Sequence, residues 1–108
     1  MDAALPEPLD AYFSSSNAHD PDRVAGCFAE DGRLHDEARD HQGRAAIRSW
    51  AVDTARKYQH RQDVLAVERA GDRYVVTVRV TGTFPGSPIE LRNRFQIRDR
   101  KITDLEIG

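Results

Sequence analysis

Apolar residues in the first half of the chain recur with the 3.6-residue period of an α-helix. One stripe predicts a helix from about Glu7 to Asn17, and its members are Leu5, Leu9, Tyr12 and Phe13. A later stripe predicts a helix from about Arg44 to Tyr58, and its members are Ile47, Trp50, Ala51, Thr54 and Tyr58.

A short helix is expected between these two. Asp20 can cap its N-terminus, and Pro21 suits its first position because proline lacks the amide hydrogen that would go unpaired there. Val24 and Phe28 fall on its buried side. The stretch FAEDGRLHDE, residues 28–37, then predicts the end of this helix, a turn at residues 31–32 and a short strand, followed by a polar, charged loop.

The second half of the chain changes to the two-residue period of β-strands. Residues 64–80 predict two strands around a turn at residues 70–72, and residues 87–107 predict two more around a turn at residues 99–100. The apolar rows are Tyr74, Val76, Val78 and Val80 in one strand and Ile89, Leu91, Asn93, Phe95 and Ile97 in another. Helices followed by an antiparallel meander predict an α+β fold, with helices covering one face of a curved sheet.

Three polar side chains interrupt the predicted inward faces. Asp36 shares a strand face with Leu34, Asn93 lies in the middle of an apolar row, and Tyr12 brings a hydroxyl into a helix stripe. A buried carboxylate or amide is costly without a partner. The three groups could therefore converge on one pocket, which periodicity allows but does not show.

Composition narrows the class of protein. A chain of 108 residues makes one domain, and its net charge of −2 argues against a nucleic-acid binder, which needs basic residues for phosphate contacts. The single cysteine, Cys27, rules out an internal disulfide and the usual zinc patterns. The N-terminal residues show no signal peptide, and no apolar run reaches membrane-spanning length. We therefore expect a reduced, cytoplasmic protein without a membrane partner.

The sequence resembles the nuclear transport factor 2-like superfamily, in particular its SnoaL-like and ketosteroid isomerase-like bacterial members. The resemblance rests on a tyrosine in the first helix, the step NAHDPD, the motif FAEDG before a strand, and GRAAIRSW at the start of the third helix. It extends over nearly the whole chain, as a single domain of residues 1–108. It implies a cone-shaped, curved antiparallel sheet wrapped around helices, a cystatin-like roll with one deep apolar pocket, often dimeric through the outer face of the sheet.

The resemblance also implies roles for the three polar residues. Tyr12 falls where the steroid isomerases keep a tyrosine that donates to the substrate oxyanion, and Asp36 falls where they keep the general base. Asn93 stands where they keep a protonated aspartic acid as the second donor, and an amide donates without needing a raised pKa. Ala51 is a departure, because those enzymes have a supporting tyrosine there. The residues expected to line the pocket are Phe13, Phe28, Leu34, Trp50, Leu91, Phe95 and Leu105.

Simpler roles remain open for the same residues. Asp36 could pair with Arg33, Arg39 or Arg44 at a pocket rim, and Tyr12 and Asn93 could be structural polar groups with buried partners. His35 and His41 flank acidic residues, but His35 faces away from Asp36 and their spacing fits no usual metal site, so no metal is expected. Asp104 is expected on the outer face, opposite an apolar row of Thr103, Leu105 and Ile107.

We therefore expect an isomerase, cyclase or dehydratase that needs no cofactor. Asp36 would remove a proton alpha to a carbonyl of a small, largely apolar molecule, and Tyr12 and Asn93 would stabilise the enolate. The alternatives are a non-catalytic ligand-binding module or a protein-interaction domain of the same fold. The expected partners are a small apolar molecule with a carbonyl or enol-type oxygen and a second copy of the chain, with no nucleic acid.

Overall fold

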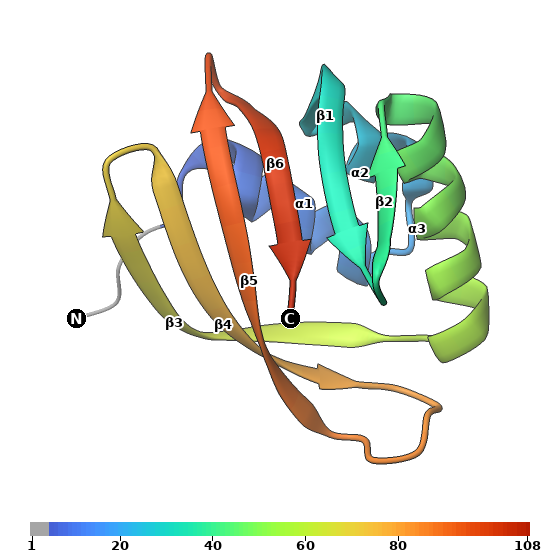
Figure 1. Ribbon diagram of the computed structural model, residues 1–108. Coiled ribbons are helices and arrows are strands. Elements are labelled where there is room, and N and C mark those ends of the chain that lie inside the picture. Colours follow the sequence, from blue (N-terminus) through green and yellow to red (C-terminus); the bar gives the residue numbers. More distant parts are fainter. Residues whose placement is uncertain (1–4) are drawn as a thin grey trace.

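The computed structural model describes residues 5–108; residues 1–4, at the start of the segment expected to lack a signal peptide, lie outside that part. The described chain forms three helices: α1 (Glu7–Asn17), α2 (Pro21–Gly26) and α3 (Arg44–Tyr58). It also forms six strands: β1 (Phe28–Asp36), β2 (Arg39–Gln42), β3 (Arg61–Ala70), β4 (Arg73–Thr81), β5 (Ile89–Arg98) and β6 (Lys101–Ile107). All six strands belong to one curved sheet, and the helices cover its concave side (Figure 1).

The strand order is β2-β1-β6-β5-β4-β3. The run from β3 to β6 is the antiparallel meander that the alternating pattern predicts. β6 then pairs with β1 in parallel, which places the N-terminal hairpin beside the last strand. This long-range pairing closes the cone, and periodicity alone did not reveal it.

Local sequence accounts for the helix ends. The side chain of Asp20 accepts a hydrogen bond from the backbone amide of Arg23 at 3.2 Å, and Pro21 is the first residue of α2, as predicted. α3 ends at Tyr58, and its C-cap is Gln59, a residue in the left-handed conformation whose amide bonds to the Ala55 carbonyl. The chain therefore turns sharply out of α3 and enters β3 two residues later.

The region between α2 and α3 corrects three expectations. Phe28 is fully buried but belongs to β1 and not to α2, and the predicted turn at residues 31–32 is an irregularity within one strand. The polar loop after Asp36 instead folds back as β2, with Asp36 opposite Arg39. Short polar edge strands such as β2 lack an alternation of apolar and polar residues. The sequence pattern therefore does not predict them.

The core lies between α1 and the sheet. The ring of Tyr12 packs edge-to-face against Phe13, Phe28 and Phe95, with centroid distances of 5.1, 6.1 and 5.5 Å.

On the outer face of the sheet, Arg33 bonds Asp104 at 2.6 Å, so Asp104 faces outward as predicted. A bulge between Gln96 and Ile97 also turns Ile102 inward, a residue that strict alternation placed outside.

Candidate functional site

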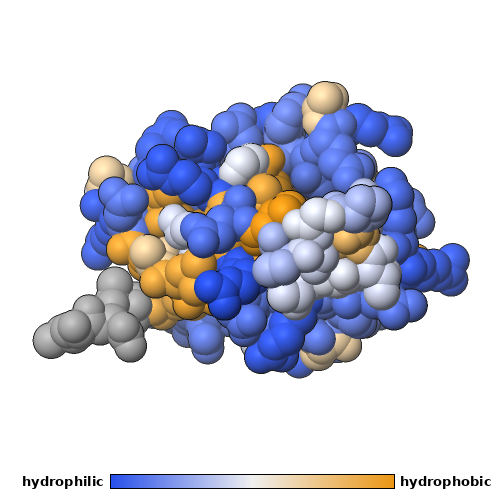
Figure 2. Space-filling view, turned by 90° about the horizontal axis from the view of Figure 1, so that it is seen from below, coloured by the Kyte–Doolittle hydropathy of each residue, from blue (hydrophilic) through white to orange (hydrophobic). Residues whose placement is uncertain are grey.

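The open end of the cone holds a cavity of about 420 Å³. Viewed from below, apolar surface gathers in the middle of this end and hydrophilic residues surround it (Figure 2). Its lining residues come from both halves of the chain: Tyr12, Asp36, Glu37, Trp50, Thr54, Tyr58, His60, Gln62, Val80, Phe84, Pro85, Ile89, Leu91 and Ile107. A cavity of this size holds a small organic molecule.

One wall of the cavity is a row on α3. Trp50, Thr54 and Tyr58 are four residues apart and therefore share a helix face. The loop after β4 borders the cavity beside them and is tied to α3, because the Thr83 amide bonds to the Tyr58 carbonyl at 2.7 Å. Gly82 permits this approach, since a Cβ there would lie only 2.5 Å from the Tyr58 carbonyl oxygen.

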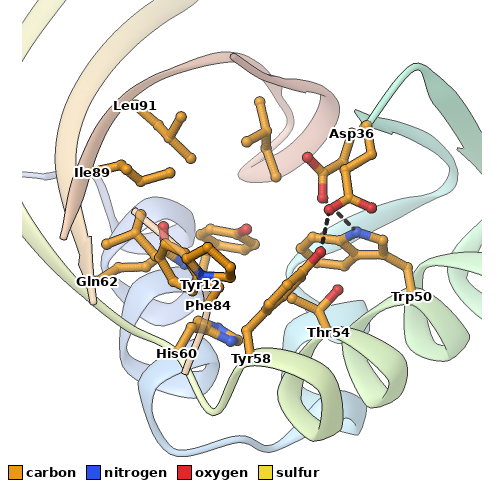
Figure 3. A pocket seen from close by; sticks show the side chains of 14 residues that line it. Tyr12, Asp36, Trp50, Thr54, Tyr58, His60, Gln62, Phe84, Ile89 and Leu91 are labelled. Carbon is orange, nitrogen blue, oxygen red and sulfur yellow. Dashed lines mark hydrogen bonds between the residues drawn. The ribbon is translucent and has the colours of Figure 1, made fainter. Parts of the chain in front are cut away.

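Asp36 points into the cavity from the end of β1 and is half-buried. Its carboxylate accepts a hydrogen bond from the Trp50 indole N–H at 3.0 Å (Figure 3). Burial raises the pKa of Asp36 above its usual value, the indole N–H opposes the rise, and the charge of Glu37 adds to it. Among the described residues no basic side chain forms an ion pair with Asp36, so the expected alternative of a pair with Arg33, Arg39 or Arg44 is not seen.

Tyr12 reaches the cavity from α1, across from Asp36 (Figure 3). The side chain is fully buried, yet its hydroxyl has no hydrogen-bond partner among residues 5–108. Burial raises the pKa of Tyr12 strongly; the nearby Gln62 side chain opposes the rise and the Asp36 charge adds to it. The hydroxyl therefore keeps its proton, and its donor is unused among residues 5–108. An unpaired buried hydroxyl costs on the order of 1–3 kcal/mol, which a ligand would recover.

A polar network forms the floor of the cavity beside Tyr12. Ser16 Oγ lies 2.9 Å from His60 Nε2 and accepts a hydrogen bond from Gln62 Nε2 at 2.9 Å. Asn17 fixes the start of β3 by bonding both the amide and the carbonyl of Gln62, at 2.7 and 2.9 Å. Burial lowers the pKa of His60, and the neighbouring His19 lowers it further, so the ring is neutral at neutral pH.

Asn93 lies behind this floor and is not among the lining residues. It is 1% exposed, its Nδ2 lies 3.5 Å from Gln62 Oε1, and its Oδ1 has no partner among the described residues. The structure thus brings Tyr12 and Asp36 to one cavity and places Gln62 between that cavity and Asn93. Any effect of Asn93 on a ligand passes through Gln62.

Two of the seven predicted lining residues, Trp50 and Leu91, do line the cavity. The other five belong to the packed core, and they are Phe13, Phe28, Leu34, Phe95 and Leu105. These five face inward as expected, but they are packed together in one buried cluster, which also contains Leu9 and Tyr12 of α1. Which inward residues meet a cavity depends on that packing and not on strand periodicity.

Sequence reasoning missed several lining residues. Gln62 of β3 pairs with Val80 of β4, and cross-strand partners lie on the same face of a sheet. A predicted β3 that began at Arg61 would therefore have placed Gln62 on the inward face. Tyr58 and Thr54 were in the predicted helix stripe but were not assigned to the pocket. Glu37 and Phe84 lie in turns and loops, whose side-chain directions have no sequence period.

Comparisons with known proteins identify the family. A SnoaL-like domain model matches residues 9–105, so the chain belongs to the SnoaL-like domain family. A Sinorhizobium meliloti protein provisionally named a polyketide cyclase is 36% identical, with a TM-score of 0.93 over 96% of this chain and 95% of that one. No curated protein matches the chain.

More distant structures confirm the fold. A Catenulispora acidiphila protein with a ketosteroid isomerase-like fold, solved with trimethylamine, is 22% identical, with a TM-score of 0.86 over 97% of this chain and 86% of that one. A nuclear transport factor 2-like protein of Cytophaga hutchinsonii is 11% identical, with a TM-score of 0.80 over 100% and 93%. The α+β, nuclear transport factor 2-like fold inferred from the sequence is confirmed.

The chemistry available at the site is proton transfer and hydrogen bonding. Residues 5–108 contain no group of three or more His, Cys, Asp or Glu side chains arranged to hold a metal. His35 lies away from the cavity and bonds Asp40 at 2.6 Å. No helix in the described range is long and apolar enough to span a bilayer.

Proposed function

We propose that this protein is a cofactor-independent isomerase or cyclase that removes a proton alpha to a carbonyl of a small, largely apolar compound; a dehydratase would use the same first step. One observation carries the proposal: the Asp36 carboxylate and the unpaired Tyr12 hydroxyl face the same cavity of about 420 Å³. Membership of the SnoaL-like family and similarity to the Sinorhizobium meliloti protein provisionally named a polyketide cyclase support it.

In the proposed reaction Asp36 is the general base. Its carboxylate takes the proton from the carbon next to the carbonyl, and the electron pair of that C–H bond moves onto the carbonyl oxygen as an enolate. The protonated Asp36 then returns the proton to another carbon in an isomerisation. In a cyclisation the enolate carbon attacks a second carbonyl, whose C=O π electrons move onto its oxygen, and the resulting alkoxide takes the proton back from Asp36. The pKa of Asp36, raised by burial, makes its carboxylate a stronger base.

Tyr12 would donate a hydrogen bond to the enolate oxygen. A donor in a water-poor site favours charge that develops in the transition state. The family resemblance implies that Asn93 is the second donor. Because Gln62 lines the cavity and Asn93 does not, the Gln62 amide is the direct candidate, with Asn93 holding it from behind. Gln62 would release its bond to Ser16 or share it when the enolate forms.

Deuterium exchange tests the base assignment. 2-Tetralone in D₂O exchanges its alpha protons slowly, and NMR follows the exchange with and without protein. We expect the wild type to accelerate exchange and Asp36→Asn to reduce the acceleration by about 10²–10⁴-fold. Asp31→Asn, which makes the same change at an exposed position of β1, is the matched control and should behave as the wild type.

The same experiment distinguishes an enzyme from the alternative, a non-catalytic binding module. The hydrogen bond from Trp50 that occupies Asp36 favours this alternative, because it ties up one carboxylate oxygen. If 2-tetralone and similar ketones change the fluorescence of Trp50 but exchange no faster with the wild type, the protein is a binder and the base assignment is wrong.

We further propose a homodimer through the outer face of the sheet, following the family resemblance. That face carries paired charges, including Arg92 with Glu68 and Arg94 with Glu106. Sedimentation equilibrium at micromolar concentration should give twice the mass of the chain, and a monomer there would refute the dimer without affecting the cavity.

A further inference from the structure

The charge on the cavity wall has one sign. Asp36 and Glu37 are its two carboxylates, and no lysine or arginine belongs to the wall among the described residues. The remaining lining is mostly aromatic and aliphatic. A pair of adjacent carboxylates in such a setting has a negative potential that water screens only in part.

Glu37 is held at this acidic end by the aromatic wall. Tyr58 Oη donates a hydrogen bond to Glu37 Oε1 at 2.6 Å, and the Tyr58 ring packs edge-to-face against Phe84 at 5.7 Å. Within the described chain Glu37 has no ion pair, so its charge is available to a ligand. The carboxylate is thus oriented before any ligand arrives.

Rings placed beside a carboxylate suit a cation. Trp50, Tyr58 and Phe84 border the cavity, and aromatic rings attract ammonium groups. Outside the cavity, Lys57 shows this affinity directly, because its Nζ lies 5.0 Å from the centre of the Tyr58 ring. Lys57 itself is not a lining residue.

We propose that the acidic end of the cavity, Asp36 and Glu37 with Tyr58, Phe84 and Trp50, binds an organic ammonium group. Resting on the proposed function, this assigns the substrate to small carbonyl compounds that carry a tertiary or quaternary amine. The carbonyl oxygen lies against Tyr12 on the far side, and the ammonium lies against Glu37. The aromatic lining suits a weakly hydrated alkylated ammonium, whose charge is spread over apolar carbon groups.

An isosteric pair of probes tests the charge preference. Phenyltrimethylammonium and tert-butylbenzene have the same shape and differ in charge, and Trp50 fluorescence or ligand-observed NMR reports the binding of each. We expect the wild type to bind the cation about five- to tenfold more tightly, the sum of one exposed carboxylate contact and cation–π contacts. The preference should weaken at high salt.

Substitutions test which carboxylate causes the preference for the cation. Glu37→Gln should reduce the cation preference severalfold while leaving tert-butylbenzene affinity unchanged. Glu30→Gln, which makes the same change at an exposed position of β1, should keep the wild-type preference. Equal affinity for the two probes, binding of neither probe, or a preference that survives Glu37→Gln would each overturn the proposal.

The result is independent of the enolisation test. If 2-tetralone exchanges rapidly but the wild type shows no cation preference, only the amine-bearing substrate class is wrong. If the cation preference is present and Glu37-dependent but no ketone exchanges, the ammonium site stands and the proposed catalysis is wrong.

Discussion

The two ends of the cone use the same strands in different ways. At the closed end, the inward row of β4 and β5 includes Val76 and Phe95, and Tyr12 and Phe13 pack onto Phe95 with ring centroids 5.5 and 5.8 Å away. At the open end, the same row continues as Val80, Ile89 and Leu91, but these residues face a cavity. Apolar character is similar at both ends, so the helices decide which end becomes core and which becomes pocket.

The largest expected difference between the ends is in stability. Phe95→Ala should lower the free energy of unfolding by about 3–5 kcal/mol, because it leaves a hole in packed core. Leu91→Ala should cost only about 1–2 kcal/mol, because that half-buried side chain already borders open space. Urea unfolding measures both values. Equal losses would mean that the open end is as tightly packed as the closed end.

Ligand affinity is the next largest effect. A planar phenolate mimics the enolate, so Tyr12→Phe should weaken its binding by roughly 1.5–3 kcal/mol, and Gln62→Leu should do the same if Gln62 is the second donor. Asn93→Leu should have a smaller effect because Asn93 acts from behind Gln62. Asp36→Asn should instead strengthen binding, since it removes a repelling charge. Titration of Trp50 fluorescence measures each change, and uniform signs across the variants would contradict the assigned roles.

Matched turns at the two ends permit a smaller test. Ala38, in the turn between β1 and β2 at the open end, and Arg100, in the turn between β5 and β6 at the closed end, both have φ of 63°. Replacing either by glycine should raise stability by roughly 0.5–1 kcal/mol, because glycine adopts positive φ without steric cost. Only Ala38→Gly should also alter ligand affinity, since it loosens Glu37. Thermal unfolding and titration distinguish the two effects.

The smallest expected effect is on the pH dependence of stability. A pKa of Asp36 raised above its usual 3.8 in the folded state means that folding favours the protonated acid. The stability that this group contributes is therefore fully present below pH 3.8 and is lost as the pH rises through the folded-state pKa. Asp36→Asn lacks this loss, so its stability relative to the wild type should increase from acid to neutral pH. A difference that is flat with pH would mean that burial does not shift Asp36.

The local elements of this protein were determined by its sequence. The helix stripes, the cap at Asp20 and the alternation from Arg73 to Arg98 follow from short-range sterics and burial, and the structure has these elements where they were predicted. The inward direction of Asp36 and Tyr12 could also be read, because a residue's face follows from the period of its element.

Tertiary structure decided what those inward faces meet. The parallel pairing of β1 with β6 joins residues about 70 positions apart, and no local period encodes such a contact. The same holds for Gln62, whose place at the floor depends on Asn17 and Ser16 of α1, and for Glu37, whose direction comes from a turn. Asn93 shows the limit most clearly: its inward direction was predicted, but packing from other elements placed it behind Gln62 and outside the cavity. A pocket is the volume that side chains leave unfilled, so it becomes defined only when all the elements are packed together.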